Sequence, residues 1–486
     1  MNNLQDIISA FQEFLLLPAE TEWIEFKKNN YKPDEIGEYI SALSNSASLL
    51  NKPFGYLVFG VENDTMQVVG TEFKPNEEKI GAQALENWLA TLLSPRIDFR
   101  IYEFPYNNKN IVVFSIDATT NTPVEFKAEA FIRIGFYKKK LKEHPEKARK
   151  IWTKINNYTF EKGIAERGLT DDEVFKLLDY PSYYELTGQS LPKNSSSILE
   201  KFIEERLIVS DGRYYNITNL GAILFAKKIE QFDSLSRKAL RVIQYHGTNK
   251  FNAVKEQIGK KGYANGFGGL ISYISGILPT NEEIGHAFRH ESSLYPPIAI
   301  RELVANCIIH QDFSISGTSP MVEIFENRIE ITNPGKPLIS TLRFIDHSPE
   351  SRNETLAKFM RRINICEERG SGIDKVVSIC ELYQLPAPDF VEGDNFTRVI
   401  LFAPKKLRQM DKKDKMRAAY QHCCLKYITG ELMTNQSLRE RFNIDDKNYP
   451  IISRMIDEAK SEKLIKDYDP ENKSRKYARY IPFWAG

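Results

Sequence analysis

The stretch YPPIAIRELVANCIIH, residues 295–310, predicts a helix with two contrasting faces. It begins with two prolines, which suit the first helical turn because no amide hydrogen is needed there. Glu302, Asn306 and His310 recur at every fourth position and therefore form one polar stripe. The apolar stripe beside it consists of Leu303, Val304, Cys307 and Ile308. A buried polar stripe needs partners, and a nucleotide with its Mg²⁺ would supply them, with Asn306 as a metal ligand and Glu302 as the base that activates water.

Three further blocks follow this helix. VEIFENRIEITNPG, residues 322–335, predicts a hairpin that ends in a glycine turn at Asn333-Pro334-Gly335. Arg352-Asn353 comes next, and EERGSGI, residues 367–373, is the last block. Its glycines allow a close approach to phosphate at the start of a helix, where the amide dipoles favour an anion.

These four blocks, in this order over residues 285–405, resemble the N-box and the following motifs of GHKL ATPases. They are more narrowly similar to the module named after the carboxy-terminal region of the RecG helicase in prokaryotic Schlafen-type regulators. The resemblance implies a GHKL-like α/β sandwich over residues 231–404, with ATP as its ligand. The cofactor-binding residues that it implies are Glu302, Asn306, Asn333, Gly335, Arg369, Gly370 and Gly372, with Asn306 also a metal ligand.

One departure from the active ATPases bears on the chemistry. Asn333 replaces the aspartate that reads the adenine amino group in those enzymes. An amide accepts the same hydrogen bond but lacks the charge, so adenine specificity and ATP hydrolysis both stay open. The alternative is that Glu302 and Asn306 form a plain solvated stripe. No GxxxxGKS or GxxxxGKT pattern is present, so we do not expect a helicase motor.

Residues 1–152 predict a separate α/β unit. ETEWIEFKK, residues 20–28, alternates apolar and polar residues as a half-buried strand does. Glu20 and Glu25 would lie on opposite faces of this strand unless a bulge or bend intervenes. The elements expected after it are a helix over 35–50, strands over 55–61 and 67–70 that form a hairpin, and strands over 111–116 and 130–134.

This unit resembles the AlbA-type domain of the Schlafen family over roughly residues 18–150. The resemblance is carried by Glu25-Phe26-Lys27, by ISALSN at 40–45, by GYLVFGV at 55–61 and by FIRIG at 131–135. Many members have Gly-Gly before the central strand, where this chain has Pro53-Phe54-Gly55.

In Schlafen nucleases this domain carries a three-carboxylate site that cuts transfer RNA with a divalent metal. The resemblance implies that Glu20, Glu25 and Asp64 hold Mg²⁺ or Mn²⁺ as catalytic residues, with Glu62 as the third acid if the turn is shifted. The alternative is that the acids are structural, as in family members that are described as DNA-binding regulators and cut nothing.

Two smaller modules complete the expected fold, which is multidomain α/β and α+β. Residues 158–230 predict a winged-helix-like middle module, in which an amphipathic helix over 195–206 precedes a hairpin at Asp211-Gly212. Residues 418–486 predict a C-terminal winged helix, with helices over 437–442 and 449–462.

The charge of the chain is balanced, but its basic residues are clustered. Its 66 Lys and Arg against 65 Asp and Glu give a net charge of +1, which excludes a protein that coats nucleic acid by bulk charge. Residues 138–150 and a predicted linker at 405–417 each hold seven basic and two acidic residues. The nucleic-acid-binding candidates are Lys27, Lys28, Lys138, Lys139, Lys140, Arg454, Lys473, Arg475, Lys476 and Arg479.

We therefore expect a cytoplasmic nucleic-acid-binding effector that senses a nucleotide and carries a metal-dependent ribonuclease site. No signal peptide or apolar span is recognised, so no membrane partner is expected. By resemblance we expect a homo-oligomer with a role in phage defence or stress response, acting on RNA or DNA. The alternative is a non-catalytic, ATP-binding transcriptional regulator that binds DNA.

Overall fold

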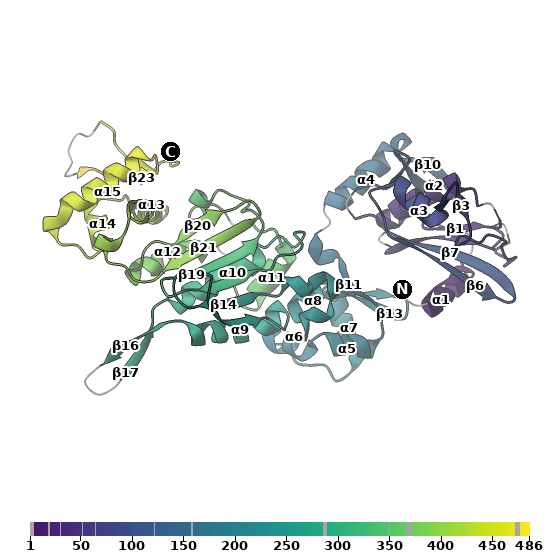
Figure 1. The fold of residues 1–486 in the computed structure, drawn as a ribbon, viewed down its shortest axis with the longest axis horizontal. Helices are drawn as coiled ribbons and strands as arrows, with labels where there is room; N and C mark the ends of the chain where they lie inside the picture. Colours follow the sequence, from purple (N-terminus) through teal and green to yellow (C-terminus); the bar gives the residue numbers. More distant parts are fainter. Residues whose placement is uncertain are drawn as a thin grey trace. The chain divides into compact units, whose positions relative to one another are not determined.

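The computed structural model describes residues 4–17, 20–29, 31–50, 52–63, 65–120, 122–156, 159–284, 289–348, 350–366, 372–471 and 477–486. The chain forms two compact units, Met1–Thr159 and Phe160–Gly486 (Figure 1).

A four-stranded sheet is the centre of the N-terminal unit, with its strands in the order β1-β2-β7-β6 (Figure 1). β1 runs parallel to β2, and the other neighbours are antiparallel. The strands are β1 (Ile24–Lys27), β2 (Phe54–Phe59), β6 (Phe99–Tyr106) and β7 (Lys109–Asp117).

Helices cover both faces of this sheet. α1 (Leu4–Phe14) packs with Ile24 and Phe26 on one face. α2 (Pro33–Leu49) packs with Leu57 and other residues of the opposite face. Because side chains alternate along a strand, Glu25 lies on the α2 side.

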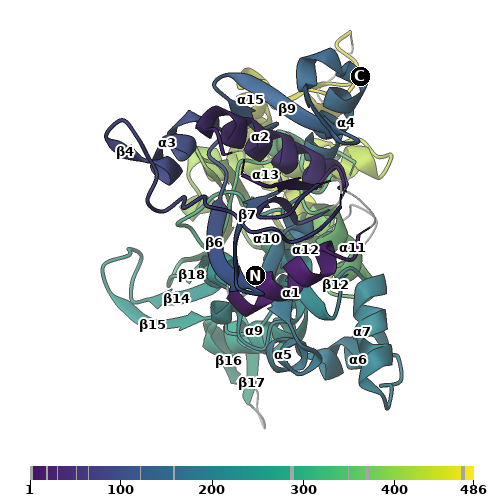
Figure 2. The same ribbon diagram turned by 90° about the vertical axis from the view of Figure 1, so that its right-hand side faces the viewer.

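A second sheet, ordered β10-β9-β8-β5, lies against α2 (Figure 2). Asn45 of α2 donates its amide hydrogens to the carbonyl oxygens of Val124 (2.9 Å) and Phe131 (2.8 Å), which fixes this sheet on the helix. Its strands are β5 (Leu93–Ser94), β8 (Glu125–Phe126), β9 (Glu129–Ile134) and β10 (Tyr137–Lys140); the flanking elements are β3 (Lys79–Ile80), β4 (Gln83–Ala84), α3 (Leu85–Leu92) and α4 (Pro145–Asn156).

Two details of the predicted N-terminal unit are wrong. The strand expected over 20–28 is shorter, because a turn in which the amide of Ile24 donates to the carbonyl of Thr21 (3.3 Å) precedes β1. The expected hairpin of 55–61 with 67–70 shrinks to a single bridge between Val61 and Val68, since β1 and β7 occupy both edges of β2.

The assignment of the middle module as a winged helix stays a prediction. A strand and three helices precede a hairpin whose turn at Gly212 has a positive φ of 63°. The elements are β11 (Ile164–Leu169), α5 (Asp171–Leu177), α6 (Tyr180–Thr187), α7 (Ser195–Glu204), β12 (Ile208–Asp211) and β13 (Tyr214–Thr218), followed by α8 (Asn219–Phe225). One hydrophobic core extends from Leu169 in this module to Leu401 in the next, so the two are continuous, and the boundary predicted between them stays a prediction.

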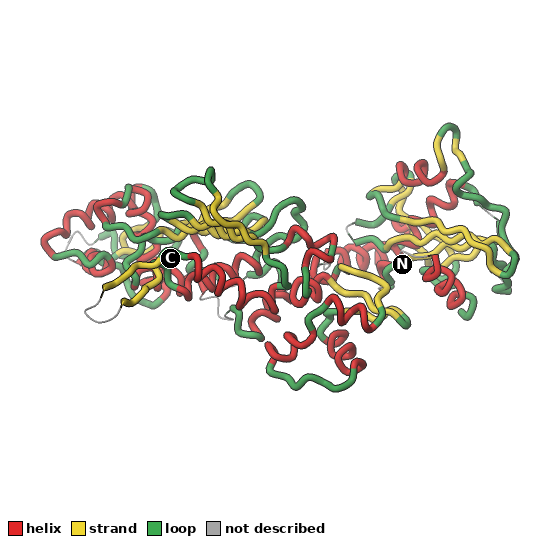
Figure 3. The backbone as a smooth tube through the Cα atoms, turned by 60° about the horizontal axis from the view of Figure 1, so that its bottom comes forward, coloured by secondary structure: helices red, strands yellow, loops and turns green. Residues whose placement is uncertain are grey.

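A six-stranded sheet, ordered β15-β14-β18-β19-β21-β20, forms the predicted α/β sandwich (Figure 3). α10 (Pro297–Ile309) packs on β19 and against α12 (Gly372–Leu382). The remaining elements are β14 (Arg241–Tyr245), β15 (Ala253–Ile258), α9 (Tyr263–Ile277), β16 (Thr280–Ile284), β17 (Arg289–Ser293), β18 (Met321–Ile324), β19 (Arg328–Pro334), α11 (Glu354–Arg362), β20 (Asp389–Glu392) and β21 (Phe396–Phe402).

The assignment of the C-terminal module as a winged helix likewise stays a prediction. The expected linker over 405–417 is largely helical instead, because Asp411 caps the start of α13 by accepting from the amide of Asp414 (2.8 Å). The elements are α13 (Lys412–Ile428), α14 (Asn435–Arg441), α15 (Tyr449–Ser461), β22 (Ile465–Asp467) and β23 (Tyr480–Pro482). Among the described residues, no helix has both the length and the apolar character that a membrane crossing requires.

Candidate functional site

A cavity of about 220 Å³ lies beside α10 and the strands β19 and β21. Glu302, Asn306 and His310, the polar stripe predicted for this helix, all line the cavity, and so do Asn333 and Gly372. Another wall of the cavity is formed by residues 336–348 and 350–351, which we call the lid. The lid residues that line the cavity are Lys336, Pro337, Leu338, Ile339, Phe344, His347, Ser348, Glu350 and Ser351.

Glu302 lies against the first turn of α12. Its side chain is buried, and a Cβ atom added at Gly372 would lie 2.1 Å from Glu302 Oε1. Gly372 is therefore required for this close approach. The carboxylate is also placed favourably, since the amino end of a helix carries partial positive charge.

Asn333 presents a fixed amide to the cavity. Its Nδ2 atom donates to the backbone carbonyls of His310 (3.4 Å) and Pro334 (3.2 Å). Because carbonyl oxygens only accept hydrogen bonds, the two contacts orient the amide and leave Oδ1 as an acceptor. The next turn requires glycine at Gly335, because φ is 102° there and an added Cβ atom would lie only 2.7 Å from Asp312 Cβ.

His310 is held neutral. Burial lowers its pKa, and the nearby charge of Arg352 lowers it further, to about 4. Arg352 also anchors the lid, because its Nη2 donates to the carbonyl of Lys336 (2.9 Å) while its Nη1 donates to Asp312 Oδ2 (2.8 Å).

Two predicted residues of this site, Arg369 and Gly370, lie outside the described residues. The same holds for Asp64 of the predicted carboxylate site and for the wing residues Lys473, Arg475 and Lys476.

Glu20 and Glu25 come together in the N-terminal unit around Arg133. The turn before β1 folds Glu20 back, so that its Oε1 accepts from the amide of Phe26 (2.8 Å). Arg133 of β9 forms ion pairs with Glu20 (3.1 Å) and with Glu25, and Lys27 pairs with Glu25 Oε1 (2.5 Å). Burial lowers the pKa of Arg133, while the charge of Glu20 raises it.

This arrangement does not fit a divalent ion as it stands. All four carboxylate oxygens of Glu20 and Glu25 already contact a donor or a cation, so a metal would have to displace Arg133 or Lys27. Glu62, the alternative third acid, is partly exposed and pairs with Lys28 (3.5 Å). Over the described parts of the chain, no group of three acidic, histidine or cysteine side chains could hold a metal ion. The metal site stays a prediction.

Cations and aromatic rings share the surface near the acid pair. The Nζ atoms of Lys27 and Lys138 lie 4.9 Å and 4.3 Å from the centre of the Tyr39 ring. Phe136, in the turn between β9 and β10, is 57% exposed, and Tyr137, the first residue of β10, is 70% exposed. Of the other predicted basic residues, Lys139, Lys140, Arg454 and Arg479 are exposed, and Lys140 pairs with Glu129 (3.2 Å).

Sequence reasoning missed Arg133 and the exposed aromatic pair. Arg133 stands out in the sequence as a charged residue inside the apolar strand FIRI. A buried charge needs a partner, and this could have indicated its role. The signal for Phe136 and Tyr137 was their position after Gly135 in a turn, where core residues are not expected.

The comparisons agree with both resemblances. Residues 20–142 match the family model "Schlafen, AlbA_2", and residues 317–401 match the model "Putative ATP-dependent DNA helicase recG C-terminal". An AlbA-type Schlafen domain and a RecG-C-terminal-like ATPase module are therefore present in one chain, as predicted.

Two solved structures are similar at low identity. The DIP2311 protein from Corynebacterium diphtheriae has 14% identity and a TM-score of 0.43, over 99% of this chain and 97% of that chain. The N-terminal domain of a RecG-related protein from Nitrosomonas europaea has 22% identity and a TM-score of 0.20, over 28% of this chain and 90% of that chain. No curated protein matches the chain.

Proposed function

We propose that this protein is a nucleic-acid-binding effector that binds an adenine nucleotide in the cavity beside α10. The observation that carries the proposal is the convergence of Glu302, Asn306, Asn333 and Gly372 on that cavity. The match of residues 317–401 to an ATPase-type family supports the same ligand class.

Each of these residues has a distinct task in the proposal. The Asn333 oxygen accepts a hydrogen bond from the adenine amino group, and the amino end of α12 at Gly372 attracts a phosphate. Asn306 would hold Mg²⁺, which supplies charge neutralisation for the phosphates. Glu302 shares this end of the helix, so its carboxylate and the phosphates compete for the same positive potential.

The test is calorimetric titration of the full chain with ATP and Mg²⁺. Asn306→Ala and Asn333→Ala should each weaken binding, because each removes a polar contact in the cavity. Asn252→Ala, an exposed position on the same domain, is the matched control and should bind as the wild type does. Negligible heat from the wild type, equal to that from Asn306→Ala, would refute the proposal.

Contacts with single-stranded nucleic acid are proposed for the surface around Tyr39 and for the β9–β10 hairpin, and contacts with a duplex for the C-terminal module, where the predicted residue Arg454 is exposed. Support comes from the cations that surround Tyr39 and from the two exposed rings, Phe136 and Tyr137. Exposed aromatic rings beside cations bind single-stranded nucleic acid by stacking and charge. We extend the proposal to a homo-oligomer that acts in stress or phage response, on the Schlafen resemblance alone.

The contacts of the acid pair favour a protein that binds nucleic acid without cleaving it. Arg133 and Lys27 already neutralise Glu20 and Glu25, which suits a structural role better than a metal-dependent reaction. The ribonuclease version is the second candidate, supported by the family match over residues 20–142. A cleavage trial with transfer RNA and Mn²⁺ separates the two.

A further inference from the structure

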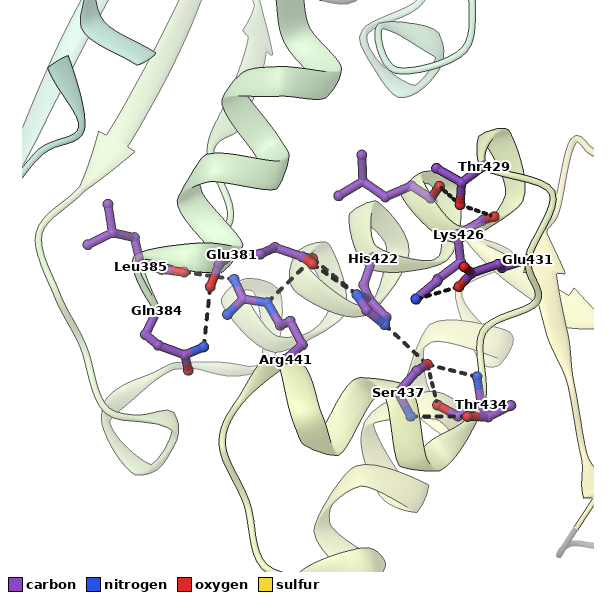
Figure 4. Close-up of polar contacts among 11 residues, drawn as sticks. Glu381, Gln384, Leu385, His422, Lys426, Thr429, Glu431, Thr434, Ser437 and Arg441 are labelled. Carbon is purple, nitrogen blue, oxygen red and sulfur yellow. Dashed lines mark hydrogen bonds and ion pairs between the residues drawn. The ribbon is translucent and has the colours of Figure 1, made fainter. Parts of the chain in front are cut away.

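α12 joins the cavity to the C-terminal module. Gly372, its first residue, lines the cavity beside Glu302, and Glu381 near its other end contacts two helices of the C-terminal module (Figure 4). A helix of this length transmits a displacement from one end to the other, because its backbone hydrogen bonds make it stiff.

Glu381 is held by His422 of α13 and by Arg441 of α14. His422 Nδ1 lies 3.0 Å from Glu381 Oε2, and Arg441 Nε lies 3.6 Å from Oε1 (Figure 4). The carboxylate only accepts, so Nδ1 donates to it, and Nε2 lies 3.1 Å from Ser437 Oγ. Arg441 also donates to the carbonyl of Leu385 (2.7 Å), just beyond α12.

Ser437, His422 and Glu381 contact one another in the same order as the serine, histidine and acid of a hydrolase triad. Here, however, the serine hydroxyl contacts the backbone. Ser437 is part of the capping box of α14, in which its Oγ accepts from the amide of Thr434 (3.0 Å). The chain of contacts therefore links three helices, and we assign it no hydrolytic role.

The C-terminal module also contacts the lid. The hydroxyl of Tyr420 donates to the carbonyl of Leu342 and accepts from Trp484 Nε1 (3.0 Å). The guanidinium of Arg343 lies 4.4 Å from the centre of the Trp484 ring. Ile345, also on the lid, is 5% exposed and belongs to the hydrophobic core of the C-terminal module.

We propose that the C-terminal module sets the nucleotide affinity of the cavity, with Tyr420 and Trp484 as positioning residues. The module contacts two walls of the cavity, the lid and α12. Without its contacts to the C-terminal module, the lid is free to move. The lid must then become ordered when the nucleotide binds, and this ordering lowers the binding affinity. This inference rests on the proposed function of the cavity.

The test compares two variants of α13, each of which loses one tyrosine hydroxyl. Tyr420→Phe keeps the ring but removes the bridge between Leu342 and Trp484, and we expect it to weaken ATP binding by roughly 5-fold or more, the lower end of typical couplings. Tyr427→Phe is the control: the Tyr427 ring also packs against Trp484, with 5.5 Å between the ring centres, and loss of its hydroxyl should leave affinity unchanged. Trp484→Phe, which removes the indole donor, should reproduce the effect of Tyr420→Phe.

Calorimetry with ATP and Mg²⁺ and hydrogen exchange of the lid amides are the two readouts. We expect Tyr420→Phe to speed exchange over residues 336–348 while the melting temperature stays close to that of the control. Wild-type protein that binds ATP, with Tyr420→Phe and Trp484→Phe binding equally well, overturns this inference alone. Wild-type protein that does not bind ATP overturns the proposed function and this inference with it.

Discussion

Glu20 and Arg133 are 113 residues apart in the sequence, yet Glu20 Oε2 lies 3.1 Å from Arg133 Nη2 in the interior of the N-terminal unit. Arg133 is fully buried, and Glu20 and Glu25 are nearly so. A guanidinium is planar and always charged, which suits it to bridge two carboxylates. The same contact fixes β9 beside β1.

Loss of this guanidinium should lower the free energy of unfolding of the N-terminal unit. Arg133→Ala removes the guanidinium that two buried carboxylates share, and breaking a buried ion pair in this way typically costs about 3–5 kcal/mol. Urea denaturation followed by tryptophan fluorescence measures it, since Trp23, Trp88 and Trp152 all lie in this unit. Lys74→Ala breaks an exposed pair with Glu77 (3.2 Å) and should cost less than about 1 kcal/mol. Equal small losses in both variants would contradict a stabilising role for Arg133.

Local periodicity is enough to predict the polar stripe of α10. Residues at every fourth position must share a helical face, so Glu302, Asn306 and His310 can be grouped without any knowledge of the tertiary structure. In the same way, the alternation of side chains along a strand predicts which face of the sheet Glu25 occupies. The order of helices and hairpin in the two smaller modules follows from turn signals and amphipathic helices.

Partners across long sequence separations cannot be predicted in this way. Periodicity says which face a residue occupies and nothing about what packs there, so it misses the Arg133 bridge between Glu20 and Glu25. The helical start of α13 resembles a linker in the sequence, because its charged residues mask the cap at Asp411. The contact of Tyr420 with the lid depends on how two modules pack, which no local pattern encodes.

The acid pair should not support metal-dependent cleavage. With transfer RNA and Mn²⁺, we expect wild type and Glu25→Gln to leave the RNA equally intact, because Arg133 and Lys27 occupy the carboxylate oxygens. Gel electrophoresis of the RNA is the measurement, with Glu77→Gln, an exposed position, as the control. Cleavage by wild type and Glu77→Gln that is lost in Glu25→Gln would establish the ribonuclease instead.

The exposed rings at the β9–β10 turn should contribute to binding of single-stranded nucleic acid. Stacking of a base on an aromatic side chain is worth about 1–3 kcal/mol, so Phe136→Ala and Tyr137→Ala should each weaken binding by about 5- to 150-fold. Fluorescence anisotropy with a labelled single-stranded RNA measures the change. Phe251→Ala removes another exposed ring (89%), in the second unit, and should have no effect. Equal affinities of Phe136→Ala, Tyr137→Ala and Phe251→Ala for the RNA would exclude stacking at this turn.

Asp374, in the first turn of α12, should make stability depend on pH. Burial raises its pKa, the charge of Asp346 raises it further, and the result is about 6. The folded state therefore binds the proton more tightly than the unfolded state, whose carboxyl titrates near 3.8. The stability contributed by this group is complete below about pH 3.8 and is lost as the pH rises through 6.

Asp374→Asn removes this titration and should raise the melting temperature at pH 7.5. Near pH 4 the variant and the wild type should melt alike, because the native carboxyl is then protonated. Thermal melting at both pH values is the measurement, with Asp457→Asn on the exposed face of α15 as the control. A gain in Asp374→Asn that is the same at both pH values would rule out titration as its cause.

Nucleotide and nucleic acid should influence each other's binding through the C-terminal module. If nucleic acid bound to that module changes the affinity for ATP by some factor, thermodynamic linkage requires that ATP change the affinity for nucleic acid by the same factor. Anisotropy titrations of a labelled duplex, with and without saturating ATP and Mg²⁺, measure that factor. Arg454→Ala removes an exposed cation on α15 and should lower duplex affinity while leaving the factor unchanged. Tyr420→Phe should instead shrink the factor toward one, because it cuts the contact between the module and the lid. A factor that is equal in wild type and Tyr420→Phe would mean that the nucleotide signal reaches nucleic acid by another route.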